Sequence, residues 1–230
     1  MSLRRTFLVF SAIDAVAPRP QTHLVPKINW VDSRLFKDPV FWSLTMSLVM
    51  TVFGYQVPYF FLSVYTREKT LNISQTLSTL PITVCNFSAA LGRVLVGFAS
   101  DHLGPTNTFI IAITVSGLLQ AVMWNFAYSY ATIMAFSMLY GFWGGCFVSL
   151  LSPVAAQLFG HKQLANVSGL LALTYMPGIT AGPTIASVVL SSSRHNWHVV
   201  TIYSGGVQLV GVLIFLYARF KRERRVFSFY

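Results

Sequence analysis

The sequence predicts an all-α integral membrane protein with six transmembrane helices. Hydrophobic residues make up 54% of the 230-residue chain and charged residues only 10%, where an ordinary soluble domain has roughly 25% charged residues. The charges are also absent from long stretches, namely 39–66, 70–92, 102–161, 163–193 and 195–218. A soluble domain of this length cannot bury so much apolar surface, so the stretches without charge indicate segments that lie in lipid.

Each charge-free stretch is long enough to cross a bilayer, which needs about 20 mostly apolar residues for about 30 Å of hydrocarbon. Glycine and proline inside such segments are tolerated better in lipid than in water. The predicted spans are about 40–64, 75–98, 107–127, 130–153, 165–190 and 198–218. We therefore expect a cytoplasmic N-terminal segment and linker (1–38), a six-helix transmembrane domain (39–220) and a basic cytoplasmic tail (221–230).

The basic residues predict the orientation of the domain in the membrane. Six spans place both termini on one side together with the loops at 98–106 and 154–164, and this side carries 13 of the 16 Lys and Arg residues. The opposite side carries only Arg67, Lys69 and Arg194. The positive-inside rule then places both termini in the cytoplasm of a multi-pass protein, which we expect in the plasma membrane. The formal net charge of +10 flanks a membrane and does not predict a nucleic-acid partner.

The span interiors lack the residues that catalysis or metal binding requires. No His, Asp or Glu lies in any span core, and Arg93 is the only charged residue within a predicted span. Cys85 and Cys146 both fall inside spans and are interpreted as small packing residues, not as a disulfide or a metal pair. We therefore expect no enzyme activity, no metal and no cofactor. The lipid bilayer and a small organic solute are the expected partners.

Uncharged polar and aromatic residues inside the spans are the candidates for solute binding. Gly54-Tyr55-Gln56 followed by Pro58 lies in the first span, and a Tyr–Trp–Gly–Gly pattern in the fourth. Together with Arg93, the candidate substrate-binding residues are Tyr55, Gln56, Asn86, Tyr140, Trp143 and Tyr175.

The fifth span holds a cluster of residues that disturb helices. Pro177, Gly178, Gly182 and Pro183 follow Thr174-Tyr175 within ten residues, and such a run predicts a kink that works as a gate. The alternative interpretation is that the glycines only allow close helix packing.

The loop after the second predicted span has the form G-x-x-x-D-x-x-G, with Gly97, Asp101 and Gly104 in GFASDHLG. This stretch resembles the cytoplasmic loop signature of the major facilitator superfamily. The segments VDSRLFKDPVFW (31–42), FGYQVPYFFLSVY (53–65), LYGFWGGCFVSLLSPVAAQLFG (139–160) and PGITAGPTIA (177–186) are similar to the carboxy-terminal half of its monocarboxylate-transporter-like, fungal-type branch. The resemblance covers about residues 31–220 and implies helices seven to twelve of a twelve-helix carrier.

The resemblance implies roles for the loop and for Arg93. Arg93, Gly97 and Asp101 are four residues apart and share one helix face, so Gly97 can admit another helix and Gly104 suits a tight turn. In the family, this carboxylate latches the cytoplasmic side through an arginine or a helix amino terminus. Arg93 matches the arginine that binds a substrate carboxylate in the animal carriers. The acid that the family's proton-coupled carriers have one turn earlier is replaced by Ala89, which departs from their pattern.

The sequence therefore predicts a secondary carrier of a small organic solute, such as a monocarboxylate, that works by alternating access. Six helices are one half of such a carrier, so we expect a truncated or half-length form. The partners that would complete it are a missing amino-terminal half, a second copy of the chain or a full-length carrier. The alternative function is a non-transporting membrane protein that binds and regulates a full-length carrier.

Overall fold

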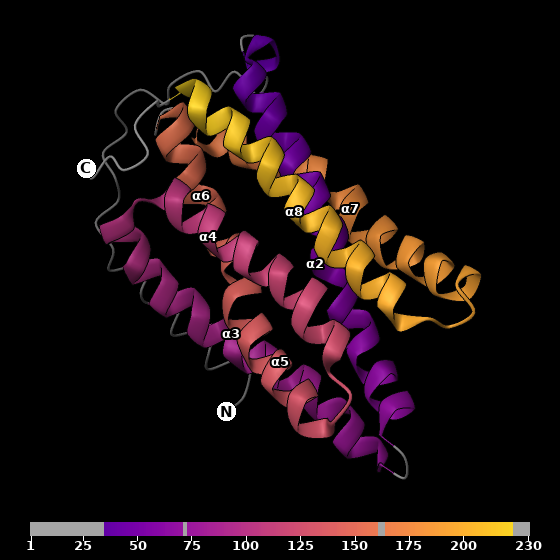
Figure 1. Cartoon of the computed structure of the whole chain (residues 1–230). Helices are drawn as coiled ribbons and strands as arrows, with labels where there is room; N and C mark the ends of the chain where they lie inside the picture. The colour runs from indigo at the N-terminus through magenta and orange to yellow at the C-terminus, as the bar shows by residue number, and fades with distance from the viewer. Residues whose placement is uncertain (1–34, 71–72, 161–163, 223–230) are drawn as a thin grey trace, which may run out of the picture. The chain divides into compact units, whose positions relative to one another are not determined.

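The structure, a computed structural model, describes residues 35–70, 73–160 and 164–222, and this part of the chain consists of helices joined by short loops. Three short helical turns accompany the longer helices: η1 (Leu35–Lys37), the π-helical η2 (Leu119–Met123) and the 3-10 turn η3 (Trp124–Phe126). The α-helices are α2 (Pro39–Lys69), α3 (Gln75–Leu103), α4 (Pro105–Leu118), α5 (Tyr130–Gly144), α6 (Cys146–Phe159), α7 (Leu164–Ser192) and α8 (Trp197–Arg222) (Figure 1).

The predicted fold class is confirmed, because six helices are long and apolar enough to cross a membrane. They are 22 to 31 residues long; α4 continues through η2 and η3 to form the third, and α5 with α6 forms the fourth. Helix α2 continues to Lys69, beyond the apolar stretch at 40–64, and its 31 residues extend about 45 Å. This length exceeds the hydrocarbon thickness, so we expect the last turn, with Arg67 and Lys69, to stand among the lipid headgroups.

Two of the predicted segments fall largely outside the described residues. Residues 1–34 of the N-terminal segment and residues 223–230 of the basic tail lie there.

Side chains at the amino termini of the helices explain where several of them begin. Asp38 accepts a hydrogen bond from the Val40 backbone N–H at 2.9 Å, and Pro39 occupies the first turn of α2. Ser74 accepts from the Leu77 N–H at the start of α3, and Ser129 caps α5 together with Thr132 in a capping box. These contacts satisfy N–H groups that have no partner inside the helix.

Helices α2 and α8 make the most extensive helix–helix contact and lie side by side along their length (Figure 1). Small residues allow the two backbones to approach. The hydroxyls of Ser43 and Ser47 donate to the carbonyls of Ile214 and Gly211 at 2.6 and 2.7 Å. A Cβ at Gly54 would collide with the Ser204 carbonyl oxygen. Because lipid gives helices little hydrophobic reason to associate, this close contact and these hydrogen bonds hold the pair together.

Glycine also brings α3 against α5 and divides the fourth span. A Cβ at Gly141 would collide with the Cys85 carbonyl, and one at Gly92 with the Phe142 carbonyl. The fourth span, Tyr130–Phe159, is interrupted at a single residue: α5 ends at Gly144 and α6 begins at Cys146. Gly145, at the break, lies so close to Ala89 that an added Cβ would stand 2.5 Å from the Ala89 Cβ. The break therefore occurs where the neighbouring helix leaves no room for a side chain.

The contact between α3 and α5 predicts that Gly141→Ala destabilises the protein. The new Cβ meets the backbone of Cys85, which cannot rotate away, and overpacking of this kind costs about 1–3 kcal/mol. We expect the apparent Tm in detergent, followed by tryptophan fluorescence, to fall by roughly 2–4 °C for each kcal/mol. Gly206→Ala is the matched control, because no atom lies within 4 Å of its added Cβ. Equal effects of the two substitutions would contradict this packing.

Candidate functional site

A cavity of about 150 Å³ lies between α2, α6 and α7 and contains three of the residues that the sequence predicts for solute binding. Tyr55 and Gln56 come from α2 and Tyr175 from α7. The remaining lining is apolar: Val52, Phe147, Val148, Leu151 and Ile179. None of the eight lining residues is charged. The lining thus combines aromatic and aliphatic surface with two phenols and one amide, which is typical of sites for small organic molecules.

The polar groups in this cavity, named the α2–α7 cavity below, differ in whether they have a partner. The Tyr55 hydroxyl donates to the Tyr59 hydroxyl at 3.1 Å, and its ring packs edge-on against Phe147 at a centroid distance of 4.7 Å. Gln56 and Tyr175 are half-buried, and neither side chain has a recorded hydrogen bond to another described residue. Their donors and acceptors are therefore available to a bound molecule.

Arg93 lies beside this cavity and not in its lining. Its Nε donates to the Gly145 carbonyl at 3.2 Å, at the break between α5 and α6. The guanidinium is within electrostatic reach of the Tyr55 hydroxyl and the Cys146 thiol. The carbonyl uses one of the five N–H groups of the guanidinium, which leaves a positive charge with further donors next to an uncharged cavity.

The other three predicted solute-binding residues do not line the α2–α7 cavity. Tyr140 is fully buried, and its hydroxyl donates to the Tyr55 backbone carbonyl at 2.8 Å, so it lies behind Tyr55. Asn86 is exposed on α3 and donates to the Ile82 carbonyl one turn earlier. Trp143 is half-buried and packs edge-on against Phe142 at 5.4 Å. Helical spacing alone does not distinguish these positions from Tyr55, because all of them lie in apolar spans.

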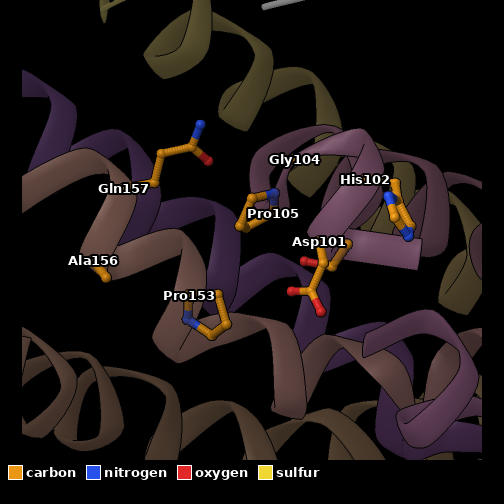
Figure 2. Close-up of a pocket in the computed structure, with 8 residues that line it drawn as sticks. Asp101, His102, Gly104, Pro105, Pro153, Ala156 and Gln157 are labelled. Carbon is orange, nitrogen blue, oxygen red and sulfur yellow. The ribbon is translucent and has the colours of Figure 1, made fainter. Parts of the chain in front are cut away.

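The G-x-x-x-D-x-x-G motif, which the sequence places in a loop, lies in the last two turns of α3 and at its one-residue junction with α4, Gly104. It borders a second cavity of about 360 Å³, named the loop cavity. Figure 2 shows Asp101 and Pro105 on one side of it and Pro153 and Gln157 of α6 on the other. Gly104 ends α3 and begins α4 with φ +84°, a conformation that L side chains rarely adopt. Asp101 is exposed, and no ion pair is recorded for it within the described residues. Gly97 has no atom within 4 Å of an added Cβ.

Gln157 holds the loop cavity together, and the sequence analysis did not single it out. Its Oε1 accepts hydrogen bonds from the Thr106 backbone N–H at 3.2 Å and from the Thr106 hydroxyl at 2.6 Å. An amide from α6 therefore caps the amino terminus of α4. No local signal predicts this contact, because the two residues are 51 positions apart.

Helix α7 runs through the predicted kink as one continuous helix, with Pro177 and Pro183 inside it. Gly178 and Gly182 face α2: an added Cβ at Gly182 would stand 2.7 Å from the Phe53 carbonyl oxygen, and one at Gly178 would stand 3.3 Å from Val49 and Val52. Close packing onto α2 therefore accounts for the two glycines in this conformation.

Six helices long and apolar enough to cross a bilayer, with a cavity between α2, α6 and α7, define a polytopic membrane protein. The model of the Major Facilitator Superfamily matches residues 44–227. The chain belongs to that family of transporters, and its predicted resemblance is confirmed.

Curated relatives include fungal and animal transporters. The MFS transporter asaE of Aspergillus flavus is 31% identical over 215 residues, which cover 93% of this chain and 48% of the relative. The fujikurins efflux protein of Gibberella fujikuroi is 26% identical over 216 residues, which cover 92% and 46%. Monocarboxylate transporter 10 of the mouse is 23% identical over 198 residues, which cover 84% and 38%. The chain thus spans about half the length of the relatives it matches.

The geometry at Gly97 and Gly104 predicts that replacement by alanine has opposite effects on stability at the two positions. Gly104→Ala forces a side chain into a strained backbone conformation, which costs about 1–3 kcal/mol. Gly97→Ala adds a methyl group in open space within α3, where alanine is the better helix former by about 0.5–1 kcal/mol. We expect the apparent Tm of the purified chain to fall for Gly104→Ala and to stay or rise for Gly97→Ala. A fall for Gly97→Ala alone would contradict the geometry of the loop.

Proposed function

We propose that this chain forms the carboxy-terminal six-helix half of a secondary carrier, which moves a small organic solute by alternating access and catalyses no reaction. The α2–α7 cavity is the observation that carries this proposal, since it combines unpartnered polar groups with aromatic walls. Membership of the Major Facilitator Superfamily supports transport as the activity.

The cavity and Arg93 together suggest the chemistry of the solute. An uncharged, aromatic lining suits the apolar body of a molecule, which Gln56 and Tyr175 can orient by hydrogen bonds. A carboxylate on that molecule would meet the guanidinium of Arg93, since this cation lies next to Tyr55. The proposed solute is therefore a monocarboxylate or related metabolite with an aromatic or bulky apolar body. The name of the mouse relative, a monocarboxylate transporter, agrees with this class.

A second six-helix half is the proposed partner. In their most apolar stretches only 28% of α3 and 22% of α7 are buried, compared with 67% of α2. Both helices expose large apolar side chains, among them Phe87 and Leu91 on α3 and Leu173 and Met176 on α7. Gly97 offers open space on α3 for the close approach of another helix. An amino-terminal half suits this surface, and the chain's coverage of about half of each relative supports that partner.

Alternating access requires a helix that can change shape, and α7 is the proposed gate. Pro177 and Pro183 have no N–H to donate, so the carbonyls of Leu173 and Ile179 lack their usual helical partners. Gly178 and Gly182 let α7 slide against α2 without a side chain to obstruct it. The motif Gly97, Asp101 and Gly104 would then latch the cytoplasmic end against the partner half.

We place both termini and the loop cavity on the cytoplasmic side of the plasma membrane. The asymmetry of 13 basic residues against three supports this orientation. A relative named as an efflux protein supports the plasma membrane.

Arg93→Gln tests the proposed site. The chain would be co-expressed with the amino-terminal six helices of the Aspergillus flavus relative and reconstituted in liposomes. We expect saturable uptake of radiolabelled phenylpyruvate, with weaker uptake of lactate, which lacks the aromatic body. A hydrogen bond to a charged group contributes about 1.5–3 kcal/mol, so Arg93→Gln should lower phenylpyruvate uptake at low concentration by roughly 10- to 100-fold.

Arg67→Gln is the matched control, because Arg67 is exposed near the far end of α2. Unchanged uptake in Arg93→Gln, or equal loss in both variants, would contradict the role of Arg93. Failure of the chain to associate with an amino-terminal half, combined with co-purification with an intact twelve-helix carrier, would instead support the alternative function as a regulator.

A further inference from the structure

A buried polar cluster lies behind the α2–α7 cavity and joins four helical segments. Gln120 of η2 donates from Nε2 to the Tyr140 hydroxyl of α5 at 2.8 Å and to Oε1 of Gln208 of α8 at 3.0 Å. Gln208 in turn donates to the Ser116 hydroxyl of α4 at 2.5 Å. All four side chains are at most 1% exposed. Such a cluster is costly to bury in an apolar bundle unless its members find partners.

The cluster faces the part of α2 where the helix cannot satisfy its own backbone. Pro58 lies inside α2 and has no N–H, so the carbonyl of Gly54, four residues earlier, loses its helical donor. The Gln120 Nε2 lies 3.4 Å from this Gly54 oxygen, and the Tyr140 hydroxyl donates to the next carbonyl, that of Tyr55, at 2.8 Å. Side chains from η2 and α5 thus supply donors beside the position where proline removes one.

The backbone carbonyls determine how the amide of Gln120 is oriented. Gly54 and Tyr55 present oxygens that only accept, so the Tyr140 proton points to Tyr55 and the Gln120 nitrogen points to Tyr140 and Gly54. Nε2 has two hydrogens for three acceptors: the Tyr140 hydroxyl, Gln208 Oε1 and the Gly54 oxygen. The contact with Gly54 is the longest of the three, so it shares a hydrogen with another acceptor. The Gln120 Oε1 is left buried without a partner among the described residues. The amide of Gln120 thus uses its donors toward α2 and α5, while its acceptor makes no hydrogen bond to a described residue.

The local backbone of Gln120 is also unusual. Residues Leu119–Met123 form a π-helical turn between α4 and the 3-10 turn η3. A π turn inserts one extra residue into the helix and redirects the side chains on either side of it. Gln120 is the buried residue of this turn, so the widened backbone coincides with the side chain that reaches α2.

We propose that Gln120, Tyr140 and Gln208 form a clamp that holds the proline turn of α2, residues 54–58, and so fixes the direction in which Tyr55 and Gln56 enter the cavity. In this clamp, Gln120 offers a donor to the Gly54 carbonyl that Pro58 leaves without one. The π turn η2 orients the Gln120 side chain toward that carbonyl. Gly54 is pressed against the Ser204 carbonyl of α8, so the turn is held from α8 as well as from the clamp. These residues act on the solute through α2 and do not touch it.

A double-mutant cycle tests the clamp on the full chain in detergent micelles. Gln120→Met removes the amide but keeps the length of the side chain, and Pro58→Ala restores an N–H that can bond the Gly54 carbonyl. We expect Gln120→Met to lower the apparent Tm by roughly 5 °C in the native background and by less in the Pro58→Ala background, where the contacts with Tyr140 and Gln208 are still lost but the Gly54 carbonyl has regained a donor. Pro58→Ala should thus partly suppress the defect, which a residue that only fills space would not show.

Gln157→Met is the matched control, because the hydrogen bonds recorded for Gln157 go to Thr106 at the start of α4 and not to α2. Its loss of Tm should be the same in the native and in the Pro58→Ala background. Equal losses for Gln120→Met in both backgrounds would overturn the proposal.

A second measurement remains decisive if Gln120→Met does not survive extraction. In the milder variant Gln120→Asn, whose amide is one carbon shorter, hydrogen–deuterium exchange should accelerate at residues 54–59 of α2. Exchange at 176–182 of α7 should stay unchanged. Acceleration that spares 54–59, or that is uniform over the helices, would overturn the clamp. Neither readout depends on transport or on a partner half, so the proposed function can fail while the clamp stands, and the reverse.

Discussion

Backbone hydrogen bonding inside an apolar environment is the constraint on which the rest of this structure depends. Lipid offers no water to an unpaired carbonyl or N–H group, so each spanning segment must satisfy its own backbone or obtain help from a neighbour. Yet five prolines lie inside the described helices: Pro58, Pro81, Pro153, Pro177 and Pro183. Each one removes a helical hydrogen bond, and the surroundings of each decide whether the helix is rigid or adaptable at that point.

The two sides of the α2–α7 cavity differ in this respect. On α2, donors from Gln120 and Tyr140 lie beside Pro58, and the serine and glycine contacts with α8 bring the backbones close together. On α7, Pro177 and Pro183 leave the carbonyls of Leu173 and Ile179 without their helical donors. Among the described residues, no hydrogen bond from another helix to these carbonyls is recorded. The cavity is therefore bounded by a firmly held helix on one side and a less restrained helix on the other. This asymmetry fits the proposed carrier function, in which the site would need fixed groups for recognition and a moving wall for release.

Much of the fold could be predicted from the sequence, because long charge-free stretches determine where helices cross a membrane. The break at Gly145 could not, since a Gly–Gly pair only shows that a neighbour is close and does not identify Ala89 as that neighbour. The glycine motif at 97–104 predicts a turn only through its last residue, because Gly104 takes a backbone conformation that other residues rarely adopt, whereas 97–103 continue α3. The hydrogen bonds between Gln157 and Thr106, just after the motif, could not be predicted, because they depend on how α6 packs against the start of α4.

The candidate site was less predictable than the fold. Tyr55, Gln56 and Tyr175 lie in the cavity, whereas Tyr140 lies behind it and Asn86 and Trp143 face elsewhere, because apolar spans carry little periodicity to indicate which face is inward. Gln120 and Gln208 were overlooked although a glutamine in the middle of a span is itself a signal of function. Their partners lie 66 and 92 residues away along the chain, so only packing reveals why they are there.

Protection of the cavity by solute tests the central claim most directly. A Gln56→Cys variant of the chain, assembled with the amino-terminal half of the Aspergillus flavus relative, would be labelled with a membrane-permeant maleimide. The native Cys85 and Cys146 are buried, so the new thiol provides the signal. Phenylpyruvate should slow labelling at position 56 and leave labelling of Ser152→Cys, on an exposed part of α6, unchanged. Labelling at position 56 that proceeds at the same rate with and without phenylpyruvate would contradict the account.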